Sequence, residues 1–87
     1  MTEAAIKKQC TKKLQDGGWL VVHLIQTNLN GIPDTLCLKE GRAVFIEFKR
    51  PGQKPRELQE YRIKKIRESG FEVVVITTVE QVLMYLK

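Results

Sequence analysis

The stretch Gly31-Ile32-Pro33-Asp34, followed by Ile46-Glu47-Phe48-Lys49, decides how this chain is expected to fold. Between the two motifs lie an apolar run over residues 35–38 and a turn around Gly41. Glycine supplies the positive φ that a tight hairpin turn needs, so residues 35–38 and 43–49 are predicted to pair as two strands. Folding back at this turn places Asp34 beside Glu47 and Lys49, and the sequence therefore predicts that two acids and a lysine share one site.

The charged side chains of this hairpin suggest a chemistry. Glu47 and Lys49 leave the same face of their strand, because side chains alternate between faces. Two close carboxylates repel unless a cation lies between them, and Mg²⁺ with oxygen ligands is the usual solution. Such a site would support phosphodiester hydrolysis, with Lys49 orienting the attacking water. Taken alone, however, such residues more often form the polar side of an edge strand beside a solvated turn.

Composition narrows the class of protein. The 87 residues predict one domain over residues 1–87 with a single modest core. The net charge of +5 favours a polyanionic partner, although many soluble proteins are equally basic. Cys10 and Cys37 lack zinc-ligand spacing and are expected to be reduced, buried thiols in a cytoplasmic protein. We find no signal peptide or membrane-spanning run, so no membrane partner is expected.

Residues 2–15 are predicted to form the first helix, with Ile6, Cys10 and Leu14 on its buried face. Glu3 falls on this same face and could point toward the site. Alternatively, Glu3 satisfies exposed amides of the first helical turn, where the helix dipole favours negative charge. The lysines on the other faces are expected to be solvated, with phosphate contact as the alternative; they are Lys7, Lys8, Lys12 and Lys13.

Residues 19–25 form a nearly continuous apolar run that predicts a strand covered on both faces. His23 interrupts this run, and a hydrogen-bonded core or rim position is favoured over a metal or acid–base role. Residues 26–33 form the one long irregular connection, in which Asn30 is a candidate phosphate contact and ordinary turn chemistry is the favoured explanation.

Residues 56–69 are predicted to form the second helix, after a basic loop. Gln59 lies on its inward side, where it could hold a carboxylate, a water or a phosphate, or simply bond to neighbouring backbone. Residues 71–77 predict a central strand parallel to the one before it, and residues 78–86 a short amphipathic helix. The candidate nucleic-acid contacts are Arg50, Lys54, Arg56, Arg62 and Asn30.

Four features occur in order along the chain: Glu3, the Gly31-Ile32-Pro33-Asp34 motif, the Ile46-Glu47-Phe48-Lys49 motif and Gln59. In this arrangement the chain resembles the VRR-NUC family of the PD-(D/E)xK nuclease superfamily, and its compactness resembles the stand-alone, virus-type (phage) members. The resemblance implies an α/β fold with a restriction-endonuclease-like αβββαβ core. This core has a mixed central sheet flanked by helices, followed here by a short C-terminal helix.

The resemblance also implies roles for individual residues. Asp34, Glu47 and the main-chain carbonyl of Phe48 would bind Mg²⁺ or Mn²⁺, and Glu3 would complete the site directly or through water. Lys49 would position the nucleophile and Gln59 would support it. Because Glu3 is so close to the N-terminus, fraying could weaken its contribution.

The implied activity is that of a divalent-metal-dependent DNA endonuclease, selective for four-way (Holliday) junctions or other branched DNA. Small relatives of this type act as symmetric dimers, so a homodimer is expected. No organic cofactor is expected. The alternatives are a non-catalytic nucleic-acid-binding module on the same scaffold and, more weakly, a protein-interaction subunit with an acidic partner.

Overall fold

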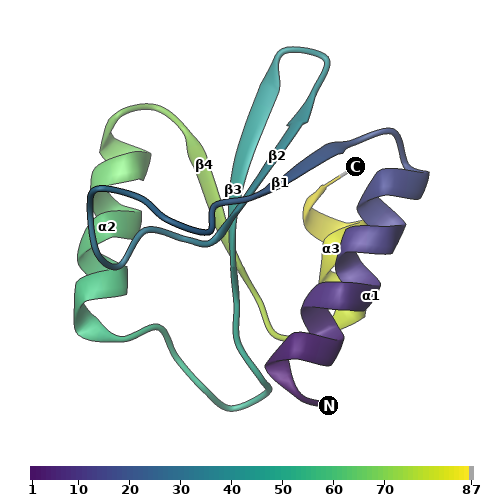
Figure 1. The fold of residues 1–87 in the computed structure, drawn as a ribbon, viewed down its shortest axis with the longest axis horizontal. Helices are drawn as coiled ribbons and strands as arrows, with labels where there is room; N and C mark the ends of the chain where they lie inside the picture. The colour runs from purple at the N-terminus through teal and green to yellow at the C-terminus, as the bar shows by residue number, and fades with distance from the viewer. Residues whose placement is uncertain (87) are drawn as a thin grey trace.

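Over residues 1–86, the computed structural model has three helices and one four-stranded sheet (Figure 1). The elements in chain order are α1 (Glu3–Asp16), β1 (Leu20–His23), β2 (Thr35–Lys39), β3 (Arg42–Phe48), α2 (Glu57–Glu68), β4 (Glu72–Ile76) and α3 (Val79–Tyr85). This order confirms the α/β fold class expected from the sequence. The predicted domain ends at Lys87, which lies outside the described residues.

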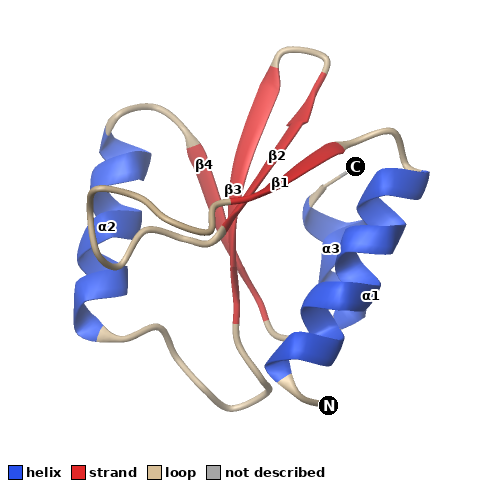
Figure 2. Ribbon diagram, in the orientation of Figure 1, coloured by secondary structure: helices blue, strands red, loops and turns tan. Residues whose placement is uncertain are grey.

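The sheet separates two layers of helix: α1 and α3 lie on one side, and α2 lies on the other (Figure 2). The main core fills the space between the sheet and the α1–α3 pair. Its largest fully buried side chains include Ile6, Leu14, Ile46, Phe48 and Val82. None of the helices over residues 1–86 is both long and apolar enough to cross a membrane.

The predicted hairpin is formed by β2 and β3. Its two-residue turn has Glu40 at φ 49° and Gly41 at φ 79°, the left-handed values that match the twist of an antiparallel pair. The pairing runs from Lys39 opposite Arg42 to Thr35 opposite Ile46. Continuing this register by one residue places Asp34 opposite Glu47, on the same face of the sheet.

Two predictions about the outer strands were wrong in part. The strand order β1-β2-β3-β4 makes both β1 and β4 edge strands. The predicted strand over residues 19–25 shortens to β1, and Leu20 and Ile25 are exposed, because α2 does not extend over this end of the sheet. Although β4 runs parallel to β3 as predicted, it is not central. Its apolar sequence instead reflects contact with α2 on one face and α3 on the other.

The connection between β1 and β2 crosses over toward α2 (Figure 1). Arg62 of α2 donates a hydrogen bond from Nε to the Asn30 carbonyl, at 2.9 Å. Gly31 has a φ of +84°, and a Cβ at this position would lie 2.9 Å from Leu58 Cγ. Only glycine therefore fits both the backbone angle and the close approach to α2. This packing holds the chain in place just before it enters the hairpin at Asp34.

Candidate active site

Asp34, Glu47 and Lys49 lie at the end of the sheet where β2 begins and β3 ends. Lys49 follows β3 directly, and its backbone N–H donates to the carbonyl of Ile76 in β4, at 2.9 Å. The Lys49 ammonium lies 3.7 Å from Glu47 Oε1, and both side chains are largely buried. The hairpin therefore places a carboxylate and an amine side by side, as the alternation along the strand predicts.

Glu47 is a buried acid, with 5% of its surface exposed. Its Oε1 accepts a hydrogen bond from Gln59 Nε2 at 3.1 Å. Its Oε2 is also buried, and no residue in the described part of the chain donates a hydrogen bond to it. A buried carboxylate oxygen without a donor is costly, so this atom indicates a position where a further positive or donating group would bind.

The surroundings of Glu47 also change its acidity. Burial raises the pKa of Glu47 from 4.5 to about 7, and the negative charges of Asp34 and Glu3 act in the same direction. The positive charges of Lys49 and Arg56 lower this pKa but do not offset the burial. These interactions show that both acids lie close enough to Glu47 to repel its negative charge. The site thus concentrates negative charge around one buried carboxylate.

Asp34 is held by two side chains that were not predicted to belong to the site. Lys7 Nζ lies 2.9 Å from Asp34 Oδ2, and the Thr35 hydroxyl donates to Asp34 Oδ1 at 3.0 Å. Lys7 was predicted to be solvated, and this was wrong because the packing of α1 turns its side chain toward the hairpin. A signal was present in the sequence, because Lys7 lies one helical turn after Glu3 and so shares its side of the helix.

Gln59 is buried and serves two groups at once. Its Oε1 accepts the backbone N–H of Arg56 at 2.8 Å, which caps the start of α2, and its Nε2 donates to Glu47. The two explanations considered for this glutamine, backbone capping and support of a carboxylate, are therefore both found in the structure. Because the cap holds Oε1, the amide is oriented with Nε2 toward the acid.

The remaining candidate residues lie around this centre. Glu3 is exposed in the first turn of α1 and acts on Glu47 through its charge. Arg56 also lies near Glu47. Arg50 and Lys54 are exposed in the loop before α2. Arg62 and Asn30 contact each other, so they have a structural role, and their contact with nucleic acid stays a prediction.

A divalent cation fits some features of this site. The donor-free Glu47 Oε2 and the nearby Asp34 carboxylate supply oxygen ligands of the kind that Mg²⁺ prefers. Across residues 1–86, however, no three His, Cys, Asp or Glu side chains are grouped so as to hold a metal ion by themselves. Mg²⁺ is commonly bound by one or two carboxylates with water and substrate phosphates, so two acids are sufficient for this ion.

His23 is exposed at the end of β1, on the face of the sheet that α1 covers, and its Nδ1 is 3.3 Å from the hydroxyl oxygen of Thr35. The two cysteines are free and buried, as predicted. Burial raises the pKa of Cys10 and of Cys37 to about 11, so both thiols are protonated at neutral pH and unreactive.

Comparison with known proteins gives a consistent result. The profile of the VRR-NUC domain family matches residues 2–80. A protein named "Putative nuclease p44", from Acyrthosiphon pisum secondary endosymbiont phage 1, is 28% identical over 75 residues, which cover 85% of this chain and 81% of the phage protein. A solved structure of a VRR-NUC domain superposes over the full length of both chains with a TM-score of 0.87 and 26% sequence identity.

Proposed function

We propose, because the chain belongs to the VRR-NUC domain family, that it is a divalent-metal-dependent endonuclease that hydrolyses phosphodiester bonds in DNA. Membership of this family makes the chain a nuclease domain; the metal requirement, the substrate and the residue roles are our proposal. The observation that supports it is the buried Glu47 carboxylate, with a donor-free Oε2, beside Asp34 and an amine. Buried acids with strongly raised pKa values are typical of functional sites.

In this proposal, Asp34, Glu47 and the Phe48 carbonyl would hold Mg²⁺ or Mn²⁺, and Glu3 would complete the site directly or through a water molecule. When bound, the cation supplies charge stabilisation to a phosphoryl oxygen and lowers the pKa of a bound water. Gln59 holds Glu47 Oε1 by a hydrogen bond and so leaves Oε2 for the ion. Lys49, 3.7 Å from Glu47, orients the attacking water and offsets charge on the phosphate.

We further propose that branched DNA, including four-way junctions, is the preferred substrate, and that the chain works as a homodimer in the cytoplasm of a host cell. Residues 1–86 form one such site, so cutting two strands of a junction requires two copies related by a two-fold axis. Apolar side chains suitable for an interface are exposed on α3 and in or just after β1: Leu83, Met84, Tyr85, Leu20 and Ile25.

The homodimer is tested by light scattering on the intact chain over a range of protein concentrations. We expect a mass twice that of one chain at micromolar concentration. Leu83 and Met84 are exposed on α3, so replacing both with serine should leave the core intact. If α3 forms the interface, this double variant should have a mass closer to that of one chain. A mass of one chain at every concentration would contradict the dimer.

The alternative function is nucleic-acid binding without cleavage, and one observation favours it. Lys7 already supplies a positive charge to Asp34, at 2.9 Å, so this acid is paired without a metal. If that ion pair persists whenever a divalent cation is added, Asp34 is structural and the basic surface alone explains an interaction with DNA.

Incubating the protein with four-way junctions, flaps, nicked duplexes and single strands, in Mg²⁺, Mn²⁺ or EDTA, separates the two functions. We expect cleavage with either metal, fastest on the branched substrates, and none in EDTA. Restoring activity by adding Mn²⁺ after the chelator is the control for irreversible damage. DNA binding with no cleavage under any divalent metal would show that the chain is a binding module.

A further inference from the structure

A groove runs between α1 and the outer strand β1, on the opposite side of the sheet from α2. It encloses about 570 Å³. The polar side chains that line it are Lys7, Lys8, Thr11, Lys12, Gln15 and His23. We call this feature the α1–β1 groove. Its lining has three lysines and a histidine but no carboxylate, which favours an anionic ligand.

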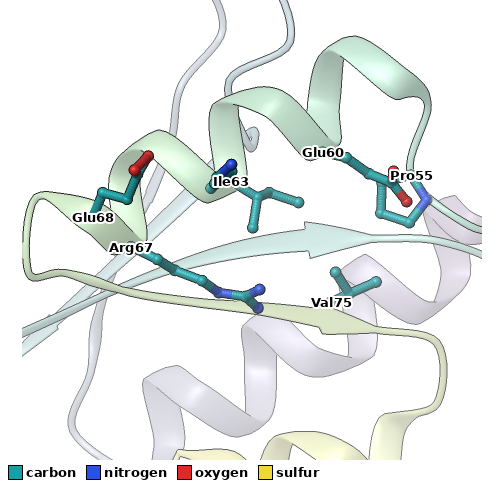
Figure 3. A pocket seen from close by; sticks show the side chains of 7 residues that line it. Pro55, Glu60, Ile63, Arg67, Glu68 and Val75 are labelled. Atoms are coloured by element: carbon teal, nitrogen blue, oxygen red, sulfur yellow. The ribbon is translucent and has the colours of Figure 1, made fainter.

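The charge of this groove differs from that of a groove of similar size between α2 and β4 (Figure 3). There, Glu60 and Glu68 stand with Lys64 and Arg67, so the positive and negative charges balance. Arg67 also donates from Nη2 to the Val73 carbonyl at 2.8 Å, which satisfies the outer edge of β4. The α2–β4 groove is therefore suited to supporting the sheet edge and does not favour a polyanion.

The α1–β1 groove connects directly to the candidate active site. The Thr35 hydroxyl has one proton, which it donates to Asp34 Oδ1, so its oxygen can accept the Nδ1 proton of His23. Lys7 contacts the other carboxylate oxygen of Asp34. Two of the residues that line the groove are thus linked to the same acid: Lys7 directly, at 2.9 Å, and His23 through Thr35, at 3.3 Å. A chain of phosphates that entered the groove would reach Asp34 at its end.

We propose that the α1–β1 groove binds the sugar–phosphate backbone of the DNA strand next to the phosphate that is cut, with Lys8 and Lys12 contacting phosphates. This inference rests on the proposed nuclease function and extends it. The candidate contacts named from the sequence lie in the loop before α2, on α2 and in the β1–β2 connection, and phosphate contact was only the alternative for the lysines of α1. Lys8 and Lys12 are exposed and one helical turn apart, so both ammonium groups can follow one strand. Among residues 1–86, the ion pair that Lys12 forms is a solvated one with Asp16, at 3.7 Å, and such a weak pair leaves the ammonium available.

The chain offers a matched control on the other side of the sheet. Lys64 and Lys65 are exposed lysines of α2, and Lys65 has a similarly weak ion pair with Glu68, at 3.9 Å. The double variants Lys8→Gln/Lys12→Gln and Lys64→Gln/Lys65→Gln lower the net charge equally. All four positions lie on the surface of a helix, so each variant should fold, and circular dichroism is the check on this.

DNA affinity is measured in EDTA by fluorescence anisotropy with a labelled four-way junction over a series of KCl concentrations. We expect the groove variant to bind at least roughly tenfold more weakly at intermediate salt, with a slope of log K against log [KCl] that is shallower by about 1.8. The control variant should stay within about threefold of the unsubstituted protein, because it loses charge but no phosphate contacts.

Equal losses in the two variants, or no loss in the groove variant, would overturn the proposal. So would a groove variant that loses affinity for polyglutamate while its affinity for DNA is unchanged, because the partner would then be an acidic protein. Cleavage by the unsubstituted chain in Mn²⁺ is recorded in parallel. If the unsubstituted chain cleaves DNA but the groove variant keeps its full DNA affinity, only the proposal for the groove is rejected. If the chain binds DNA in a salt-sensitive way without cleaving it, the nuclease function is rejected and the groove remains a DNA-binding surface.

Discussion

Replacing Asp34 with asparagine or Glu47 with glutamine is expected to slow metal-dependent DNA cleavage by about 10³-fold or more, which corresponds to several kcal/mol of transition-state stabilisation. Each substitution keeps the size of the side chain but removes a negative charge. For Glu47, the change also puts an amide where the donor-free Oε2 now lies. Initial rates on a labelled branched substrate, at saturating Mg²⁺ and at saturating Mn²⁺, give the measurement.

Two exposed acids far from this end of the sheet provide controls of the same chemistry. Asp16→Asn at the end of α1 and Glu68→Gln at the end of α2 should each leave the rate within about threefold, because surface substitutions rarely perturb the fold. If either Asp34→Asn or Glu47→Gln retained full activity while folding normally, these carboxylates would not form the catalytic centre.

The metal-free protein is expected to lose stability as the pH rises from 5 to 8, by an amount on the order of 3 kcal/mol. The pKa of Glu47 is raised in the folded chain to about 7, above its ordinary value of 4.5. The folded state therefore binds this proton more tightly than the unfolded state does. The resulting stabilisation is fully present below pH 4.5 and is lost as the pH rises through about 7.

Thermal unfolding in EDTA, followed by circular dichroism at pH 5, 6.5 and 8, measures this loss as a fall in Tm of roughly 10 °C or more. Glu47→Gln cannot ionise at this position, so the variant should be less sensitive to pH and more stable than the unsubstituted chain at pH 8. Adding Mn²⁺ at pH 8 should restore stability to the unsubstituted chain, because a ligand that binds only the native state stabilises it. Parallel pH dependences for the two proteins would contradict this account.

Much of the arrangement follows from local sequence. The turn at Glu40 and Gly41 sets the hairpin register, and this register puts Asp34 opposite Glu47. The alternation along β3 then puts Lys49 on the same side as Glu47. Capping follows equally short-range rules, since Gln81 Oε1 accepts the backbone N–H groups of Thr77 and Thr78 at the start of α3. These features depend on residues a few positions apart, or on one turn, and so can be read from sequence.

Other features depend on how distant elements pack. Periodicity reports whether the two faces of a strand are covered, but not which strands lie beside it, and for this reason β4 resembled a central strand although it lies at an edge.

The sequence by itself determined the order of the elements, the hairpin, and the position of Asp34 opposite Glu47 in the two strands. Each of these results from backbone geometry over a short span. Only the tertiary structure decided that Lys7 contacts Asp34, 27 residues away, and that His23 reaches the same acid through Thr35. The Lys7 contact depends on the position and rotation of α1 against the sheet, which the packing of many core side chains sets. The His23 contact depends on the register of β1 against β2, which places His23 opposite Thr35. The α1–β1 groove also depends on how α1 packs against the sheet.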